Sequence, residues 1–330
     1  MKRVTLKDIA KEVGVSAMAV SKVLNDRPGV SAEVSEKIRE TAKRLNYTPN
    51  LMAKGMRLRE SKTIGVITSD SSHSFFPLVI RGIEDAASRQ GYSVLLSNTN
   101  GDVQTEMNNV KLLLSKRVDG IILISSTLTS KKYSAFLSEC HVPIVFAVRR
   151  NEYSGFDCVV NDNIYGARIM TDYLIEKGDR RIHFINLPST SPSAKDRLAG
   201  YKSALAAHSI QYDKALVSNA LPTIEDGKSK MEELLARDTP AAVFCGCDMI
   251  AIGAMELLLG LGYKIPGDIR LASYDNVLFS EYLKVPLTTV SQPKYEIGFK
   301  SAEILIDRIK NERAPSVILM KPELVVRQSC

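Results

Sequence analysis

Apolar residues recur at helical spacing in three stretches near the start of the chain. Thr5 stands three residues before Asp8, which is a helix-start signature. Gly14 can end the first helix, and Ser16 is a candidate N-cap for the second. Three short amphipathic helices with a tight turn between the first two are typical of a helix-turn-helix unit. The inward positions are Leu6, Ile9, Ala10, Val13, Val20, Val23, Leu24, Val34, Ile38, Ala42 and Leu45.

The outward side of the second predicted helix carries small or hydrogen-bonding side chains and no acidic residue. Such groups can enter the major groove of DNA, where base edges are read. The alternative is a three-helix packing module without a ligand. The outward residues are Ala17, Met18, Ser21, Lys22 and Asn25.

A second segment, residues 47–62, follows the third helix with the sequence YTPNLMAKGMRLRESK. Pro49 stops the preceding helix, and Asn50 can cap a new one. The new helix is short and contains Gly55, so it is marginal by itself. Two interpretations stay open: a flexible linker with solvated charges, or a hinge helix that orders only on DNA.

From Thr63 onward, apolar strands alternate with amphipathic helices in two successive series. This alternation indicates parallel sheets covered on both faces, and two series indicate two doubly wound subdomains. Ligands bind beyond the carboxyl ends of such strands, so the cleft between the subdomains is the expected pocket. The predicted strands are 64–68, 93–97, 120–124, 144–148, 158–160, 182–186, 216–218, 241–245, 269–274, 288–290, 317–320 and 324–326. The predicted helices are 76–90, 105–115, 131–140, 165–177, 197–208, 224–236, 248–261 and 295–310.

The basic charge is concentrated at the start of the chain. Residues 1–62 contain 14 Lys and Arg against 7 Asp and Glu, and the rest of the chain is balanced, although the whole carries a net charge of +7. This distribution predicts a polyanionic partner for the first segment and a different partner for the remainder.

Signatures of an enzyme are weak. The sequence contains no Gly-rich dinucleotide or phosphate loop, and its four histidines show no metal-binding spacing. Cys245-Gly-Cys247 could be a metal or redox motif, but its place at the end of an apolar strand favours packing cysteines. We therefore predict no catalytic residue, no cofactor and no metal site. The five cysteines lack a disulfide framework, and no membrane span or signal peptide is present, so the expected location is the cytoplasm.

Several motifs together resemble the LacI/GalR (lactose-repressor) family over the whole chain. Within that family, these motifs are most similar to those of the ribose and purine repressors. They are TLKDIAKEVGVS, VSKVLN, VSAEVSEKIRETAKRLNYTPN, IGVI, FFPLVIRGIEDAASRQGY, KRVDGIIL, AVFCGCDMIAIGA, DIRLASYDN and PLTTVSQP. The resemblance implies an all-α helix-turn-helix head (1–49), a hinge (50–62) and a periplasmic-binding-protein-like α/β core (63–330). It also implies three chain crossings between an N-subdomain (63–161 and 293–320) and a C-subdomain (162–292 and 321–330).

The resemblance assigns DNA contacts by position. Base-reading positions correspond to Ala17, Met18 and Lys22. Met56 stands where the family usually has a leucine that wedges into the minor groove, and methionine is long and apolar enough for this. The remaining positions, which contact phosphates, orient the head or flank the wedge, correspond to Thr5, Ser16, Ser21, Asn25, Tyr47, Asn50, Ala53, Lys54 and Arg57.

The resemblance also assigns an effector pocket. Arg197 and Asp275 are the strongest candidates, because facing charges can bind vicinal hydroxyls; the alternative for this pair is a salt bridge between the lobes. Ser191 stands where a purine repressor has the arginine that it uses for its base, which argues against a purine as effector. Val148 stands where ribose-type pockets commonly have a carboxylate, which argues against a simple transfer of ribose as the ligand. His73 and Arg149 favour a sugar acid or a phosphorylated sugar. The pocket positions are His73, Phe75, Phe76, Arg149, Arg197, Cys247, Asp275 and Gln292.

The sequence thus predicts a cytoplasmic, nucleoid-associated homodimer that represses carbohydrate-utilisation genes. It would bind a palindromic operator in double-stranded DNA and respond to a small sugar, sugar phosphate or sugar acid. Two alternatives stay open. One is a global regulator of the same fold with a phosphorylated protein as corepressor, bound through Arg81–Gln90 and Lys294–Arg308. The other is a solute-binding or enzymatic protein of the same core fold, which the missing signal peptide and the basic head argue against.

Overall fold

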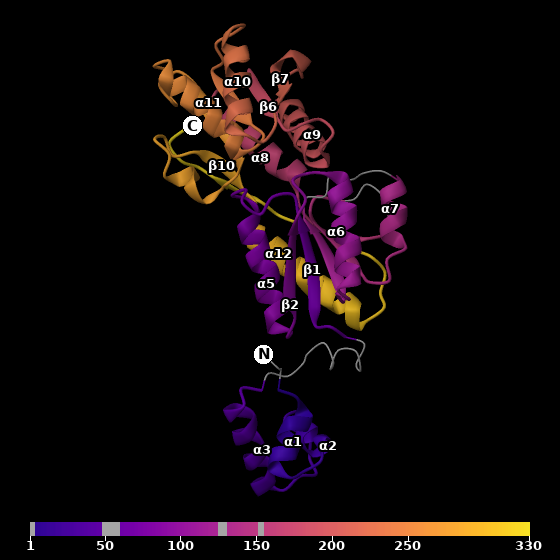
Figure 1. Cartoon of the computed structure of the whole chain (residues 1–330). Helices are drawn as coiled ribbons and strands as arrows, with labels where there is room; N and C mark the ends of the chain where they lie inside the picture. The colour runs from indigo at the N-terminus through magenta and orange to yellow at the C-terminus, as the bar shows by residue number, and fades with distance from the viewer. Residues whose placement is uncertain (1–3, 48–59, 125–130, 151–154) are drawn as a thin grey trace. The chain divides into compact units, whose positions relative to one another are not determined.

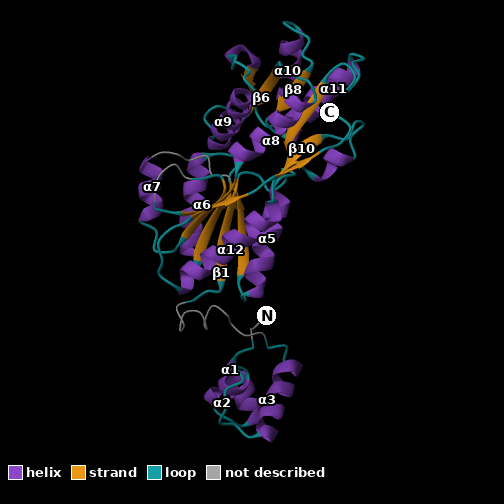
Figure 2. Ribbon diagram, turned by 180° about the vertical axis from the view of Figure 1, so that it is seen from behind, coloured by secondary structure: helices purple, strands orange, loops and turns teal. Residues whose placement is uncertain are grey.

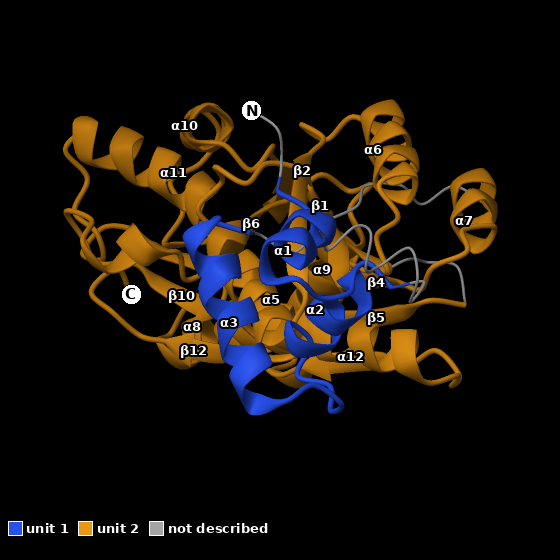
Figure 3. Cartoon of the chain, turned by 60° about the horizontal axis from the view of Figure 1, so that its bottom comes forward, with its two compact units in different colours: residues 1–61 blue, residues 62–330 orange. Residues whose placement is uncertain are grey.

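The computed structural model describes residues 4–47, 60–124, 131–150 and 155–330. The chain divides into two compact units, Met1–Ser61 and Lys62–Cys330, which Figure 3 colours blue and orange. Each is described by itself. The hinge residues Asn50, Ala53, Lys54, Met56 and Arg57 lie outside the described residues, so their predicted roles are not addressed by the structure.

The first unit consists of three helices, α1 (Leu6–Val13), α2 (Ala17–Val23) and α3 (Ala32–Arg44). The predicted start of α1 is confirmed: the Asp8 carboxylate accepts hydrogen bonds from the Thr5 backbone N–H at 2.8 Å and from its hydroxyl at 2.7 Å. Gly14 ends α1 with a φ of 75°, a conformation that glycine adopts without strain. The Ser16 hydroxyl caps α2 by accepting from the Ala19 N–H at 3.1 Å.

A small core holds the three helices together. Its members are the positions that the helical spacing indicated, and each helix contributes a buried pair. These buried residues are Ile9, Ala10, Val20, Val23, Ile38 and Ala42. So few apolar residues suffice because the helices are short and each turns only one face inward.

The second unit contains two six-stranded sheets, each with its own helices, which we call the first and second lobes (Figures 1 and 2). The first sheet has the order β11-β5-β4-β3-β1-β2, and all its strand pairs are parallel. Its strands are β1 (Thr63–Thr68), β2 (Ser93–Asn98), β3 (Gly120–Ile124), β4 (Ile144–Val148), β5 (Asp157–Asn161) and β11 (Val317–Met320).

The second sheet repeats this order as β12-β10-β9-β8-β6-β7. Its strands are β6 (Ile182–Asn186), β7 (Val217–Asn219), β8 (Ala242–Cys245), β9 (Arg270–Asp275), β10 (Thr288–Ser291) and β12 (Glu323–Val325). The expectation of purely parallel sheets is wrong at one edge, where β12 pairs antiparallel with β10. The final segment enters this lobe directly from the first lobe, without the crossover helix that a parallel neighbour requires.

Helices cover both faces of each sheet, as Figure 2 shows. In the first lobe, α5 and α12 share one apolar core with the sheet, and α6 and α7 share the other. In the second lobe, α10 and α11 cover one face, and α8 and α9 the other. The bounds are α5 (Phe76–Arg89), α6 (Val103–Ser115), α7 (Lys131–Ser138), α8 (Asn163–Glu176), α9 (Pro192–Ala207), α10 (Ile224–Leu235), α11 (Asp248–Gly260) and α12 (Lys294–Lys310), with short 3₁₀ turns η1 (Lys214–Leu216) and η2 (Leu278–Glu281).

The predicted start of one helix was wrong. α9 begins at Pro192, so Arg197 lies inside the helix and does not open it. Proline at the first helical position supplies a suitable φ and lacks only an N–H that has no helical partner there. The Ser/Pro-rich segment before Arg197 is therefore part of the first turn, although its composition indicated a loop.

The chain passes between the lobes three times. The connections leave β5 for α8, β10 for α12, and β11 for β12. Asn161, the last residue of β5, is 2 % exposed, and its side-chain amide donates to the Tyr274 hydroxyl in the second lobe at 2.8 Å. The crossings thus bring the carboxyl ends of strands from both sheets to one junction.

Two glycines allow α5 and α12 to approach closely in the first lobe. A Cβ atom on Gly298 would lie 1.9 Å from the Val79 carbonyl oxygen, and one on Gly82 would lie 2.1 Å from the Tyr295 carbonyl oxygen. Neither separation is possible between non-bonded atoms, so the crossing depends on glycine at both positions.

Candidate DNA-binding and effector-binding sites

The outward face of α2 is free of acidic side chains. Met18 is 72 % exposed, Asn25 is exposed, and Lys22 is half-buried in the last turn of the helix. The Asn25 amide donates to the Ser21 carbonyl at 2.8 Å, which holds it against the helix end. Ala17 and Ser21 are half-buried on the same short helix. A short apolar tip with hydrogen-bonding groups beside it matches what a major groove accepts.

The other candidates in the described part of the head also stabilise its fold. Thr5 and Ser16 cap helices through the hydrogen bonds given above. Tyr47 is half-buried against the core of the unit, and its N–H donates to the Ala42 carbonyl at 2.8 Å. These three residues therefore stabilise the helices of the head, whatever they contact on DNA.

In the second unit, Arg197 and Asp275 face one another in the second lobe. Arg197 is 4 % exposed, and its Nη2 lies 3.5 Å from Asp275 Oδ1. Arg197 also donates from Nε to Asn163 Oδ1 at 3.0 Å and from Nη1 to the Gly246 carbonyl. Its guanidinium carbon lies 3.8 Å from the centroid of the Tyr274 ring, so the group is held flat against an aromatic surface.

Asp275 connects this cluster to the chain crossings. The Gln292 amide donates to Asp275 Oδ1 at 2.6 Å, and the buried Lys294 ammonium donates to the Asp275 and Asn276 carbonyls at 2.5 and 3.0 Å. Burial raises the pKa of Asp275 to about 6, although Arg197 and Lys294 oppose the rise. Among the described residues, no donor is hydrogen-bonded to its second oxygen, Oδ2.

The backbone at Asp275 is strained. Asp275 and Asn276 have φ angles of 112° and 51° at the carboxyl end of β9. Residues in such conformations persist only where their surroundings hold them, and they gather at functional sites. Here the Asp248 carboxylate holds the segment, because it is wholly buried and accepts from the Val277 N–H at 2.8 Å.

Contacts between the lobes surround the pair. The alternative that Arg197 and Asp275 form a salt bridge between lobes is wrong, because α9 and β9 both belong to the second lobe. An ion pair does join the lobes: it links Arg150, which follows β4, to Asp196 of α9 at 2.9 Å. Lys294, at the start of α12, makes a second connection through the carbonyls of Asp275 and Asn276.

Three aromatic or heteroaromatic rings lie at the start of α5. The ring of Phe76 lies 5.5 Å from that of His73 and 5.4 Å from that of Phe75, measured between centroids. The Lys294 ammonium lies 5.7 Å from the Phe75 centroid, so this cluster adjoins the Asp275 segment. Burial lowers the pKa of His73, and Arg149 lowers it further, while Asp70 opposes the shift.

Arg149 follows an unusual turn. Its N–H donates to the Ala147 carbonyl at 2.8 Å, two residues back, and Val148 between them has a φ of 71°. A γ-turn of this hand is rare, and positive φ is an outlier for a β-branched residue, with a cost of about 1–3 kcal/mol. The turn directs Arg149 out of β4 at the junction of the lobes.

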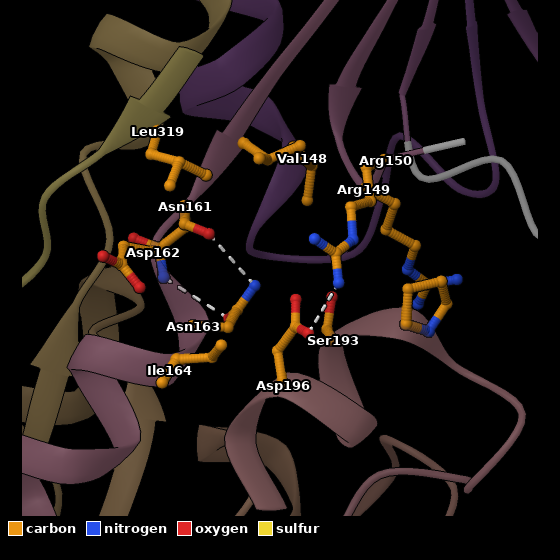
Figure 4. Close-up of a pocket in the computed structure, with 12 residues that line it drawn as sticks. Val148, Arg149, Arg150, Asn161, Asp162, Asn163, Ile164, Ser193, Asp196 and Leu319 are labelled. Carbon is orange, nitrogen blue, oxygen red and sulfur yellow. Dashed lines mark hydrogen bonds and ion pairs between the residues drawn. The ribbon is translucent and has the colours of Figure 1, made fainter. Parts of the chain in front are cut away.

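A small pocket opens at this junction, shown in Figure 4. Arg149 and Arg150 come from the end of β4 on one side, while Ser193 and Asp196 come from α9 on the other. Its volume is about 60 Å³, well below the roughly 300 Å³ or more of a typical ligand site. Of the eight predicted effector residues, only Arg149 lines it directly.

Cysteines near the site are packing residues in this structure. Cys245 and Cys247 are buried, and burial raises the pKa of each thiol. Within the described residues, no group of three or more His, Cys, Asp or Glu side chains could hold a metal ion. In the same part of the chain, no helix combines the length and apolar character needed to cross a membrane.

Sequence reasoning missed three residues of the cluster. Asn163 and Tyr274 hold the Arg197 guanidinium, and Lys294 holds the Asp275 backbone. Position offered a signal for two of them. Asn163 comes two residues after the predicted crossing at Asn161, and Lys294 directly follows the predicted crossing at 291–293, where polar side chains must lie at the lobe junction.

Comparison with known protein families identifies a matching family profile for each of the two units. The profile described as "Bacterial regulatory proteins, lacI family" matches residues 5–50. The profile described as "Periplasmic binding proteins and sugar binding domain of LacI family" matches residues 61–327. The chain belongs to the LacI family. As a LacI-family protein, it is a DNA-binding transcriptional repressor with an effector-binding domain, in a family of regulators and not of enzymes.

Relatives in the LacI family match the chain over nearly its whole length. The HTH-type transcriptional repressor PurR of Vibrio campbellii is 34% identical over 327 residues, which cover 98% of each chain. The lac repressor dimer bound to operator and the anti-inducer ONPF is 28% identical, with a TM-score of 0.90 and coverage of 99% of both chains. A complex of the transcriptional regulator CelR with cellobiose is 30% identical, with a TM-score of 0.77 and coverage of 99% and 100%.

Proposed function

We propose that this LacI-family chain is a homodimeric repressor of carbohydrate-utilisation genes that releases or holds its operator according to a small sugar-type effector. The observation that carries the proposal is the buried Arg197–Asp275 pair at the lobe junction. In the cell the protein would act in the bacterial cytoplasm, associated with the nucleoid. The domain limits expected from the sequence, with a hinge at 50–62, complete this proposal.

The chemistry of the pair suits vicinal hydroxyl groups. Asp275 offers Oδ2 as an acceptor, and Arg197 keeps N–H groups beyond the three that its described partners use. A carboxylate and a guanidinium side by side can accept from one hydroxyl and donate to its neighbour. Phe75 and Phe76 supply the aromatic surface that can cover the apolar face of a sugar ring.

The size of the pocket indicates how binding would be coupled to DNA. A space of about 60 Å³ is too small for a sugar, so a ligand requires the lobes to take a different arrangement. The Arg150–Asp196 ion pair would have to lengthen or break in that arrangement. A ligand with unequal affinity for two arrangements shifts their populations, which is the coupling that an effector needs.

Exposed apolar side chains support the homodimer. Leu95 and Leu96 are 41% and 43% exposed on β2, which forms an edge of the first sheet. In the second lobe, Leu278 and Tyr282 are 77% and 76% exposed at and beside η2. Large apolar residues exposed in groups mark interaction surfaces, and a two-fold dimer would present two heads to a palindromic operator.

In the head, we assign base reading to Ala17, Met18 and Lys22. The exposure of Met18 and the absence of acidic residues in α2 support this assignment. The remaining head and hinge positions listed from the resemblance would contact phosphates or the minor groove. Selection of DNA fragments by the purified full-length protein supplies the operator on which the assignment is tested.

The test compares Lys22→Ala with a matched loss of charge, Lys37→Ala. Lys37 lies on α3 and pairs with Glu33 at 2.9 Å. We expect Lys22→Ala to weaken operator binding by about 1–3 kcal/mol and to reduce the preference for operator over scrambled DNA, because a base contact is lost. Lys37→Ala should change both affinities equally. Equal weakening on both DNAs by Lys22→Ala would show a phosphate contact only.

A further inference from the structure

Three cationic side chains lie beside the Asp275 carboxylate at the lobe junction. Arg149, Arg197 and Lys294 carry three positive charges, and Asp275 is the carboxylate among them. The other nearby carboxylates are engaged elsewhere. Asp248, whose charge acts on Asp275 and Lys294, accepts hydrogen bonds from the hydroxyls of Ser273, Ser280 and Thr289 and from the Val277 N–H. Asp196 pairs with Arg150 at 2.9 Å, and Asp162 accepts from the Tyr165 N–H at 2.9 Å as the N-cap of α8.

Two of the three cations have partners that hold them in place. Arg197 is fixed by Asn163, the Gly246 carbonyl and Asp275. Lys294 is fixed by the carbonyls of Asp275 and Asn276. Their positions are therefore set by the protein before any ligand arrives.

Arg149 differs from both. Its guanidinium donates no hydrogen bond and forms no ion pair with any residue that the structure describes, although the side chain is half-buried and lines the pocket. Burial and the charge of Arg197 lower the pKa of Arg149, while the charge of Asp275 opposes this shift, so its surroundings on balance disfavour the charge it carries. An anionic ligand beside this guanidinium would favour its charged form, for which the described residues supply no ion-pair partner.

The backbone also indicates that the position of Arg149 is imposed. The γ-turn at Val148 is strained, and a relaxed turn would direct the next side chain elsewhere. The neighbouring Arg150 has its own carboxylate in Asp196. Within the described residues, Arg150 thus has an ion-pair partner and Arg149 has none.

We propose that the effector carries an oxyanion, a phosphate ester or a carboxylate, and that Arg149 is the residue that selects it. A planar guanidinium binds either group through two parallel hydrogen bonds. The anionic end of the ligand would lie at Arg149, and its hydroxyls at Arg197 and Asp275. This inference rests on the proposed effector-binding function of the same site and names the class of ligand.

One test needs no knowledge of the ligand. Replacement by Met keeps a long side chain and removes the charge, so Arg149→Met should raise the melting temperature of the ligand-free protein. Inorganic phosphate, compared with chloride at equal ionic strength, should stabilise the wild type and a control, Arg237→Met, at an exposed position after α10, but not Arg149→Met. Loss of ligand-free stability in Arg149→Met, or equal stabilisation of all three proteins by phosphate, would overturn the proposal.

A second test identifies the source of the oxyanion. Calorimetric titration of the full-length protein with glucose, glucose-6-phosphate and gluconate, and with ribose and ribose-5-phosphate, compares each charged ligand with its neutral parent. We expect one charged ligand to bind the wild type and Arg237→Met at least about tenfold more tightly than its parent. Arg149→Met should bring the two within about twofold, and Arg149→Lys should keep part of the difference.

The outcomes separate this inference from the proposed function. Phosphate stabilisation that depends on Arg149, without any effect of the panel on operator binding, would support the anion site and count against sugar control of DNA binding. A neutral sugar that releases the operator and binds as tightly as its charged form would support effector control and refute the role of Arg149.

Discussion

Asp275 should make the stability of this protein fall as pH rises from about 4 to about 6. Burial raises the pKa of this carboxyl from 3.8 to about 6. Within that window the unfolded chain releases the proton while the folded chain keeps it, so unfolding becomes more favourable. Each pKa unit corresponds to about 1.4 kcal/mol, so ionised Asp275 costs the fold about 3 kcal/mol at neutral pH.

The substitution that removes this cost is Asp275→Asn. An amide retains an acceptor for Gln292 and Arg197, tolerates positive φ, and cannot ionise. We expect the variant to be more stable than the wild type at pH 7.5 by about 3 kcal/mol, and about 2 kcal/mol of that advantage should disappear at pH 4.5. The wild type is less stable at neutral pH because its ligand site retains the buried, ionised carboxylate of Asp275.

The assay is urea unfolding at several pH values, at one protein concentration because a dimer's stability depends on it. Glu232→Gln, an exposed position on α10, controls for the loss of a carboxylate as such. Parallel pH profiles for the wild type and Asp275→Asn would refute the reasoning. So would a variant that is less stable at pH 7.5, since it would show that Arg197 stabilises the ionised form more than burial opposes it.

Two further predictions concern Arg197 and the α5–α12 crossing. Arg197→Ala should keep operator binding and lose the effector response, measured as operator affinity with and without sugars, sugar phosphates and sugar acids; a normal response would show that the pair is structural. Gly298→Ala should destabilise by about 3 kcal/mol in urea unfolding, because its Cβ would meet the Val79 carbonyl at 1.9 Å. Gly260→Ala, where nothing lies within 4 Å, should be neutral or stabilising by up to about 1 kcal/mol, and equal effects of the two substitutions would contradict this account.

The periodicity of apolar residues predicted helices and strands well where burial alone determines the structure. Ile9 and Ala10 of α1, and the alternating faces of β3, follow from burial alone, so apolar spacing identified them. The antiparallel pairing of β12 depends on the route of the chain between lobes, which no local pattern encodes. The helical start at Pro192 was missed because Ser and Pro serve loops and first helical turns alike.

The effector site could be predicted only in part, because some of its contacts depend on the fold and leave no pattern in the sequence. Arg197, Asp275 and Gln292 were identified by resemblance, and the structure brings them within hydrogen-bonding or ion-pair distance. Tyr274 ends a predicted apolar strand and was not among the predicted site residues, although its ring supports the Arg197 guanidinium. Arg149, which has no ion-pair partner among the described residues, follows a positive φ at Val148, and valine gives no sequence signal for such a turn.

The Asp248 carboxylate has a consequence for how this protein can acquire new ligands. It accepts hydrogen bonds from Ser273 of β9, Thr289 of β10, and Ser280 and Val277 around η2, all within one buried centre. Loss of any one donor leaves the buried Asp248 charge without enough partners. Substitutions on the side of the site that carries Asp275 are therefore poorly tolerated. Diversification of ligand preference would then fall on the opposite wall, where a single substitution after β4 alters the charge that a ligand meets and leaves the fold intact.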